Sequence, residues 1–118
     1  MSEHEFCAAF QRAVELIGRR WCGAIARALL DGPRYFAELE RAIPDISGRA
    51  LSQRLKELEA EGIVVRRVEA TSPVRVRYEL TEKGRALESV VAEVERWAHD
   101  WLEEGEREHR PAHAHVRG

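Results

Sequence analysis

The chain of 118 residues has the length of one domain, with 44% apolar and 34% charged residues and a net charge of −2, which argues against wholesale coating of nucleic acid. No apolar run approaches the ~20 residues of a membrane-spanning helix, and the N-terminus carries acids where a secretion signal carries positive charge, so we expect a soluble, cytoplasmic protein with no membrane partner. Two cysteines are too few for a disulfide scaffold and are not spaced as a zinc site.

The first half of the chain predicts four helices joined by short turns. Apolar residues recur at helical spacing over residues 6–17 and 19–31, and a glycine follows each run. A short third helix is expected over residues 35–43, before a proline. Ser47 then stands where its hydroxyl can cap a fourth helix, which Gly62 ends.

After the fourth helix the apolar period becomes that of a strand. Residues 64–68 and 74–80 flank a Thr-Ser-Pro turn, and the second run alternates apolar with charged residues, which predicts a two-stranded hairpin with a charged outer face. Thr81 begins a last, long helix that Gly105 ends. Residues 106–118 have no apolar period and are expected to form a flexible tail.

This order of elements, closely linked helices followed by a basic hairpin, is that of a winged helix-turn-helix. The expected fold class is mainly α with a small β-hairpin, in one domain over residues 1–105. Residues 47–85 hold nine basic against six acidic residues, whereas residues 86–108 hold two basic against eight acidic ones. The middle of the chain can therefore face a polyanion while the C-terminal part faces away from it.

The predicted fourth helix has one apolar and one polar side. At about 100° per residue its three inner leucines form a stripe, and the opposite side holds Arg49, Gln53 and Lys56, with Ser52 at its edge. An α-helix fits the major groove of B-DNA, where Arg pairs with guanine and Gln with adenine. Arg49, Ser52 and Gln53 are therefore predicted to meet base edges of double-stranded DNA.

Other residues are predicted to hold the DNA backbone. Ser47 and Lys56 suit phosphate oxygens, and Gly48 permits close backbone approach. Arg75 and Arg77 point to the same side of a strand of the hairpin, which we call the wing. The tip of the wing can therefore sit on phosphates or enter the minor groove. A solvated helix face and a solvated strand face are the alternatives, and the combination of the two features makes them the weaker account.

Short motifs along most of the chain resemble the HxlR-type transcriptional regulators, relatives of the MarR group. The matching segments are Cys7, Arg20-Trp21, residues 35–39 (Tyr-Phe-Ala-Glu-Leu), Ile46-Ser47, the leucine pattern of residues 51–58, residues 61–66 (Glu-Gly-Ile-Val-Val-Arg), residues 73–84 and Trp97. Arg19-Arg20 replaces the family's Gly-Lys, and Ala8 stands where Pro is common. The resemblance implies a homodimeric winged helix-turn-helix protein that controls transcription, more often as a repressor, with the first and last helices as dimer interface.

The last helix has an apolar stripe that supports a dimer independently. Valines and tryptophans recur at helical spacing on a helix too long for so small a core to cover. The expected interface contains Phe6, Phe10, Val90, Val94, Trp97 and Trp101. Symmetric dimers are the commonest assembly, and two recognition helices about 34 Å apart would read a pseudopalindromic operator. The alternative is that the stripe packs within its own chain.

Cys7 lies near the start of the first predicted helix, where the positive end of the helix dipole favours a thiolate. In the resembled family a Cys at this place serves some members as a sensor of oxidants or electrophiles, which leaves an oxidant or small-molecule effector open. A buried residue under the dimer interface is the alternative. Cys22, beside Trp21, is expected in the core.

Four histidines, His4, His109, His113 and His115, lie near the chain ends, where little preorganisation is available, so neither a metal nor another cofactor is expected. No phosphate-binding loop and no Ser-His-Asp pattern is present, which argues against an enzyme. Two other functions stay open. One is a winged-helix protein-interaction module without DNA binding, and the other is a small-molecule-sensing regulator with an inter-helix pocket.

Overall fold

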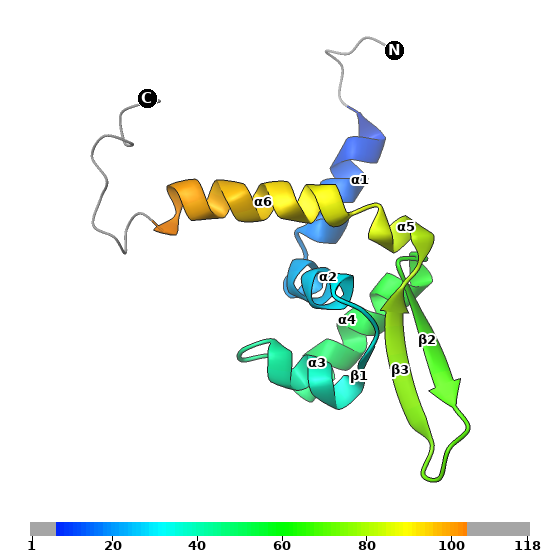
Figure 1. The fold of residues 1–118 in the computed structure, drawn as a ribbon. Helices are drawn as coiled ribbons and strands as arrows, with labels where there is room; N and C mark the ends of the chain where they lie inside the picture. Colours follow the sequence, from blue (N-terminus) through cyan, green and yellow to red (C-terminus); the bar gives the residue numbers. More distant parts are fainter. Residues whose placement is uncertain (1–6, 104–118) are drawn as a thin grey trace.

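The computed structural model describes residues 7–103, and its elements follow the predicted order (Figure 1). The helices and strands, in chain order, are α1 (Ala8–Ile17), α2 (Cys22–Leu30), β1 (Arg34–Tyr35), α3 (Phe36–Ala42), α4 (Gly48–Ala60), β2 (Val64–Glu69), β3 (Arg75–Leu80), α5 (Glu82–Arg85) and α6 (Glu88–Trp101). Helices α2, α3 and α4 with the β2–β3 wing form the winged helix-turn-helix, so the predicted fold class is confirmed. Within the described residues no helix is long and apolar enough to cross a membrane. The tail predicted at residues 106–118 lies outside the described range.

The core lies between α2, α3, α4 and the end of the sheet remote from the tip of the β2–β3 hairpin. Its most completely buried large side chains are Ile25, Leu29, Leu39, Leu51, Leu55 and Val64. The three leucines of α4 all belong to this cluster, together with Ile43, Ile63 and Leu80. Among residues 7–103 no polar or charged residue is buried, so burial of apolar surface is the main stabilising term of this core.

The sheet has three strands, so the prediction of a two-stranded hairpin was incomplete. The strand order is β1-β3-β2, and β1 pairs antiparallel with β3, with Arg34 opposite Tyr78 and Tyr35 opposite Arg77. Two residues are too short a segment to show an alternating period, and this segment runs directly into α3. The sequence therefore predicted it as the start of a helix.

The single long helix predicted from Thr81 is in fact two helices. Thr81 Oγ1 accepts a hydrogen bond from the Gly84 amide at 3.1 Å and caps the short α5. After α5 the chain forms a tight turn, in which the Leu87 amide donates a hydrogen bond to the Gly84 carbonyl at 3.0 Å. Helix α6 begins after this turn in a new direction. This break lets Leu87 pack against the core while α6 crosses the top of the molecule near α1 (Figure 1).

Gly84 allows α5 to lie directly against the turn between α4 and β2. A β-carbon at this position would clash with the backbone carbonyl oxygen of Ile63 and would lie 2.9 Å from Cδ2 of Leu80. By contrast, a β-carbon at Gly23 in α2 would meet only the Ile17 carbonyl oxygen, at 4.0 Å. Close backbone contact therefore requires glycine at position 84, whereas position 23 has room for a larger side chain.

We expect Gly84→Ala to lower the free energy of unfolding by about 1–3 kcal/mol, because overpacking against rigid backbone outweighs the helix propensity of alanine. Gly23→Ala is the matched control and should be neutral or stabilising by up to about 1 kcal/mol. Urea unfolding monitored by circular dichroism measures both changes. Equal transition midpoints for the two variants would show that the contact at Gly84 is not restrictive.

Candidate nucleic-acid interface

Helix α4 begins with the cap that its sequence predicts. Ser47 has extended backbone angles, and its Oγ accepts a hydrogen bond from the Ala50 amide at 3.0 Å. Its hydroxyl proton stays available to a further acceptor, such as a phosphate oxygen. The cap fixes where the helix starts and therefore which residues stand in its first two turns.

The outer face of α4 is open to solvent. Arg49, Gln53 and Lys56 are exposed, and Ser52 is partly buried at the edge of this face. Within residues 7–103 the first three side chains form neither a hydrogen bond nor an ion pair. The structure thus brings the predicted base-reading residues together on one face and leaves their donor and acceptor groups unused.

Gly48 has a side chain of the preceding helix close to it. A β-carbon at this position would lie 2.9 Å from Oε2 of Glu40, a residue of α3 that was not among the predicted site residues. The close approach at Gly48 is therefore made by a carboxylate of the same chain. A carboxylate beside the first turn of α4 also complements the positive end of the helix dipole.

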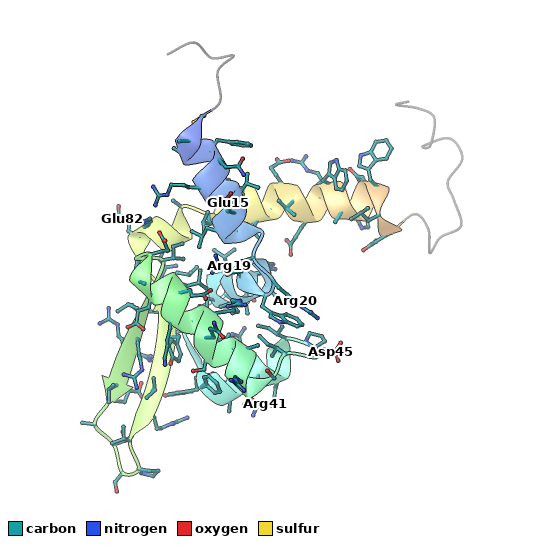
Figure 2. The ribbon with its side chains drawn as sticks, turned by 180° about the vertical axis from the view of Figure 1, so that it is seen from behind. Glu15, Arg19, Arg20, Arg41, Asp45 and Glu82 are labelled. Carbon is teal, nitrogen blue, oxygen red and sulfur yellow. The ribbon has the colours of Figure 1, made fainter. Side chains whose placement is uncertain are left out.

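A side-chain network holds α4 against the loop between α1 and α2. Arg54 donates from Nε to the Arg20 carbonyl at 3.1 Å and from Nη1 to both carboxylate oxygens of Glu57 at 3.0 Å. Arg19 pairs with the same carboxylate at 3.1 Å. Figure 2 shows Arg19 and Arg20 beside α4, which is drawn in green. Arg54 therefore orients the helix and is not free to contact DNA.

The wing arginines share one face of the sheet, as strand alternation predicts, but their contacts differ. The guanidinium of Arg75 is exposed and stacks over the ring of Tyr35, 3.8 Å from its centroid. Arg77 pairs through Nη1 with Glu69 at 3.4 Å, and its Nε is buried without a hydrogen-bond partner in the described chain. The Tyr35 hydroxyl donates to Glu69 at 2.9 Å, and this hydrogen bond raises the pKa of Tyr35.

Arg66 is a candidate that the sequence reasoning missed. It pairs in register with Tyr78, which packs against the core, so Arg66 is on the helix side of the sheet. Arg75 and Arg77 are on the opposite face. Arg66 is exposed and, within the described range, makes no ion pair. Counting alternate residues from the buried Val64 would have found it.

A second surface, formed by α1 and α6, is apolar and exposed. Its exposed residues include Phe10, which is 65% exposed, Val14, Val90, Val94 and Trp97. Trp101 is partly buried, and Phe6 lies outside the described residues. A groove of about 280 Å³ between α2 and α6 adjoins this surface, with Val90 and Val94 on one wall and an Arg27–Glu95 ion pair of 2.8 Å at its rim.

The two cysteines have opposite environments. Cys7 is exposed and is the N-cap of α1, where its sulfur accepts a hydrogen bond from the Phe10 amide at 3.3 Å. Cys22 is 2% exposed, which confirms its expected place in the core, and burial raises the pKa of its thiol.

The four histidines considered as metal ligands, His4, His109, His113 and His115, lie outside the described residues. Across residues 7–103 no cluster of three or more His, Cys, Asp or Glu side chains could hold a metal ion.

Sequence comparison identifies close relatives of the chain. The model of the HxlR-like helix-turn-helix family matches residues 16–106. The uncharacterised HTH-type transcriptional regulator YvaP of Bacillus subtilis is 46% identical over 103 residues, which are 87% of this chain and 95% of that protein. The HTH-type transcriptional regulator YodB of the same organism is 46% identical over 100 residues, covering 85% of this chain and 89% of that one.

Solved structures agree with this relationship. The reduced form of YodB from B. subtilis superimposes with a TM-score of 0.75 at 45% identity, covering 84% of this chain and 97% of that chain. The redox regulator HypR in its reduced form gives a TM-score of 0.77 at 36% identity, covering 85% and 99%. YodB has also been solved in diamide-treated and quinone-bound forms. The chain belongs to the HxlR-like helix-turn-helix family, and it is an HTH-type, DNA-binding transcriptional regulator.

Proposed function

We propose that the protein is a cytoplasmic, non-enzymatic repressor that binds a pseudopalindromic operator as a homodimer. The single observation that carries the DNA-binding part is the outer face of α4, where Arg49, Gln53 and Lys56 are exposed and unpaired within the described residues, while the leucines of the inner face are buried. A helix held in this way presents guanidinium, amide and ammonium groups to a major groove without rearrangement.

The roles of these residues follow from their chemistry. Arg49, Ser52 and Gln53 read base edges, because Arg pairs bidentately with guanine and Gln with adenine. The Ser47 hydroxyl and the Lys56 ammonium bind phosphates on either side of the groove, which fixes register without reading sequence. From the wing, Arg66 on the helix side and Arg75 near the tip add contacts to the backbone.

Replacing Arg49 with Ala should weaken operator binding by about 1–3 kcal/mol and relax base preference at one position of each half-site. Lys56→Ala should instead weaken binding to all sequences similarly and reduce the salt slope by about one. Fluorescence anisotropy with operator and scrambled duplexes, over a range of salt concentrations, measures both effects.

Arg85→Ala is the matched control, because it removes the same charge from α5, outside the proposed interface. It should leave base preference unchanged. An acidic-protein-binding module would show no preference among duplexes, and an unchanged preference in Arg49→Ala would reject the assigned base contact.

The proposed dimer is supported by the exposed apolar surface of α1 and α6. Val90, Val94 and Trp97 form a stripe along α6, and Phe10 and Val14 are exposed on α1. Apolar surface removed from water stabilises an interface by roughly 25 cal/mol per Å², so a patch of this composition favours association. Val90 and Val94 of this stripe form one wall of the groove between α2 and α6, and in the proposed dimer the partner subunit covers that groove.

Val94→Asp should convert the dimer into a monomer at micromolar concentration, because a carboxylate would be buried without a partner. Ala92→Asp adds the same charge to an exposed position about 160° around α6 from Val90 and should leave the dimer intact. Sedimentation equilibrium distinguishes the two states. A monomeric wild-type protein, or a dimeric Val94→Asp variant, would reject this interface.

We also propose that Cys7 makes the regulator responsive to electrophiles and oxidants. Its thiol is exposed at the N-terminus of α1 and accessible to a reagent in solution, and the relatives YodB and HypR have been solved in quinone-bound and oxidised forms, respectively. With a quinone, the Cys7 sulfur adds to a ring carbon and the ring takes up the proton. The product is a thioether on the adjoining dimer surface.

Benzoquinone should modify Cys7 and lower operator affinity, whereas Cys22 should remain unmodified because its thiol is buried. Cys7→Ser should retain operator binding and lose the quinone effect, and Cys22→Ala is the control that keeps it. Mass spectrometry locates the adduct, and anisotropy reports the affinity. Equal inhibition of wild type and Cys7→Ser would assign the response to another group.

A further inference from the structure

Side chains from all three strands of the sheet meet near the tip of the wing. Tyr35 comes from β1, Glu69 from β2, and Arg75 with Arg77 from β3. Tyr35 donates its hydroxyl proton to Oε1 of Glu69 at 2.9 Å, and Arg77 Nη1 lies 3.4 Å from Oε2 of the same carboxylate. Both oxygens of Glu69 are therefore engaged, and neither partner is Arg75.

This arrangement differs from the simple cross-strand pairing. In the β2–β3 register Glu69 stands directly opposite Arg75, so an ion pair between these two would be expected. The carboxylate instead binds Tyr35 and Arg77, and the Arg75 guanidinium lies over the Tyr35 ring, with its Cζ atom 3.8 Å from the ring centroid. In the described chain Arg75 is left with a stacking partner but no acceptor for its N–H groups.

A stacked guanidinium is well prepared to bind a phosphate. Its N–H donors lie in the plane of the group, so contact of one face with an aromatic ring leaves all of them free at the edge. The ring also restricts the long side chain, which lowers the conformational entropy lost when a phosphate binds bidentately. Arg77 lacks these properties, because it is half-buried, ion-paired and has an enclosed Nε.

We infer that Arg75 and Arg77 have separate tasks: Arg75 binds a DNA phosphate, Tyr35 is the positioning residue that holds Arg75 ready for it, and Arg77 only holds the wing together through Glu69. The inference rests on the proposed DNA-binding function and deepens it. It differs from the equal roles that strand alternation alone suggested for Arg75 and Arg77. The recognised group is a phosphodiester of the DNA backbone, so this contact carries no base preference.

The test is a salt-titrated double-mutant cycle with a fixed operator duplex. Arg75→Ala should reduce the slope of log K against log salt by about one, as expected for one lost phosphate contact. Arg77→Met keeps the aliphatic stem and should leave the slope unchanged. Tyr35→Leu should weaken binding about two- to fivefold in the wild-type background and have no further effect in the Arg75→Ala background.

Tyr35→Phe separates the two contacts of Tyr35, since it retains the ring and loses only the hydroxyl. Tyr35→Phe should therefore bind the operator as tightly as the wild type does, whereas Tyr35→Leu should bind it more weakly. Nuclear magnetic resonance of the free protein gives a readout independent of DNA, because the Arg75 Hδ protons should shift upfield in wild type and Tyr35→Phe but not in Tyr35→Leu.

The outcomes distinguish this inference from the function on which it rests. If the wild type binds its operator, and Arg49→Ala weakens that binding, but Tyr35→Leu and Arg75→Ala act additively, the positioning role of Tyr35 is rejected alone. A flattened salt slope in Arg77→Met would likewise reject the division of tasks. A wild type without salt-dependent DNA binding would overturn both proposals together.

Discussion

Burial of the three leucines of α4 is the constraint on which the rest of the molecule depends. Leu51, Leu55 and Leu58 are nearly inaccessible to solvent and pack against α2, α3 and the base of the sheet. Because a helix is a rigid cylinder, fixing one side of it determines the direction of the other. Arg54 adds a second attachment, to the α1–α2 loop, so the helix can neither rotate nor slide independently of the core. The polar face is thus a consequence of apolar packing.

Periodicity was sufficient to predict most of this fold. The spacing of apolar residues located α1 to α4, the Ser47 cap located the start of α4, and alternation located β2 and β3. The polar face of α4 was predictable for the same reason, since its inner stripe determines its outer face. Shorter signals failed: β1 has two residues, and the break between α5 and α6 depends on how Leu87 meets the core.

The sequence predicted on which face of a helix or strand each candidate site residue lies, but it did not predict which residues each one contacts. Alternation correctly placed Arg75 and Arg77 on one side of β3 but could not distinguish them, because Tyr35 and Glu69 come from other strands. Gly48 is similar, since the group that approaches it is Glu40 of the preceding helix. Which charged groups are neutralised within the chain is decided by tertiary packing, and local sequence carries little information about it.

The segregation of charge along the chain has a kinetic consequence. Helix α6 holds four acidic residues from Glu88 to Asp100 and crosses the end of the molecule remote from the wing tip, while basic residues lie along α4 and the wing (Figure 1). Such a molecule has an electric dipole moment and experiences a torque near a polyanion. The torque turns its basic end toward the polyanion before the two surfaces touch. Encounters with DNA are then oriented, which accelerates association. This acceleration decreases as salt screens the charges, since the Debye length is only about 10 Å at 0.1 M salt.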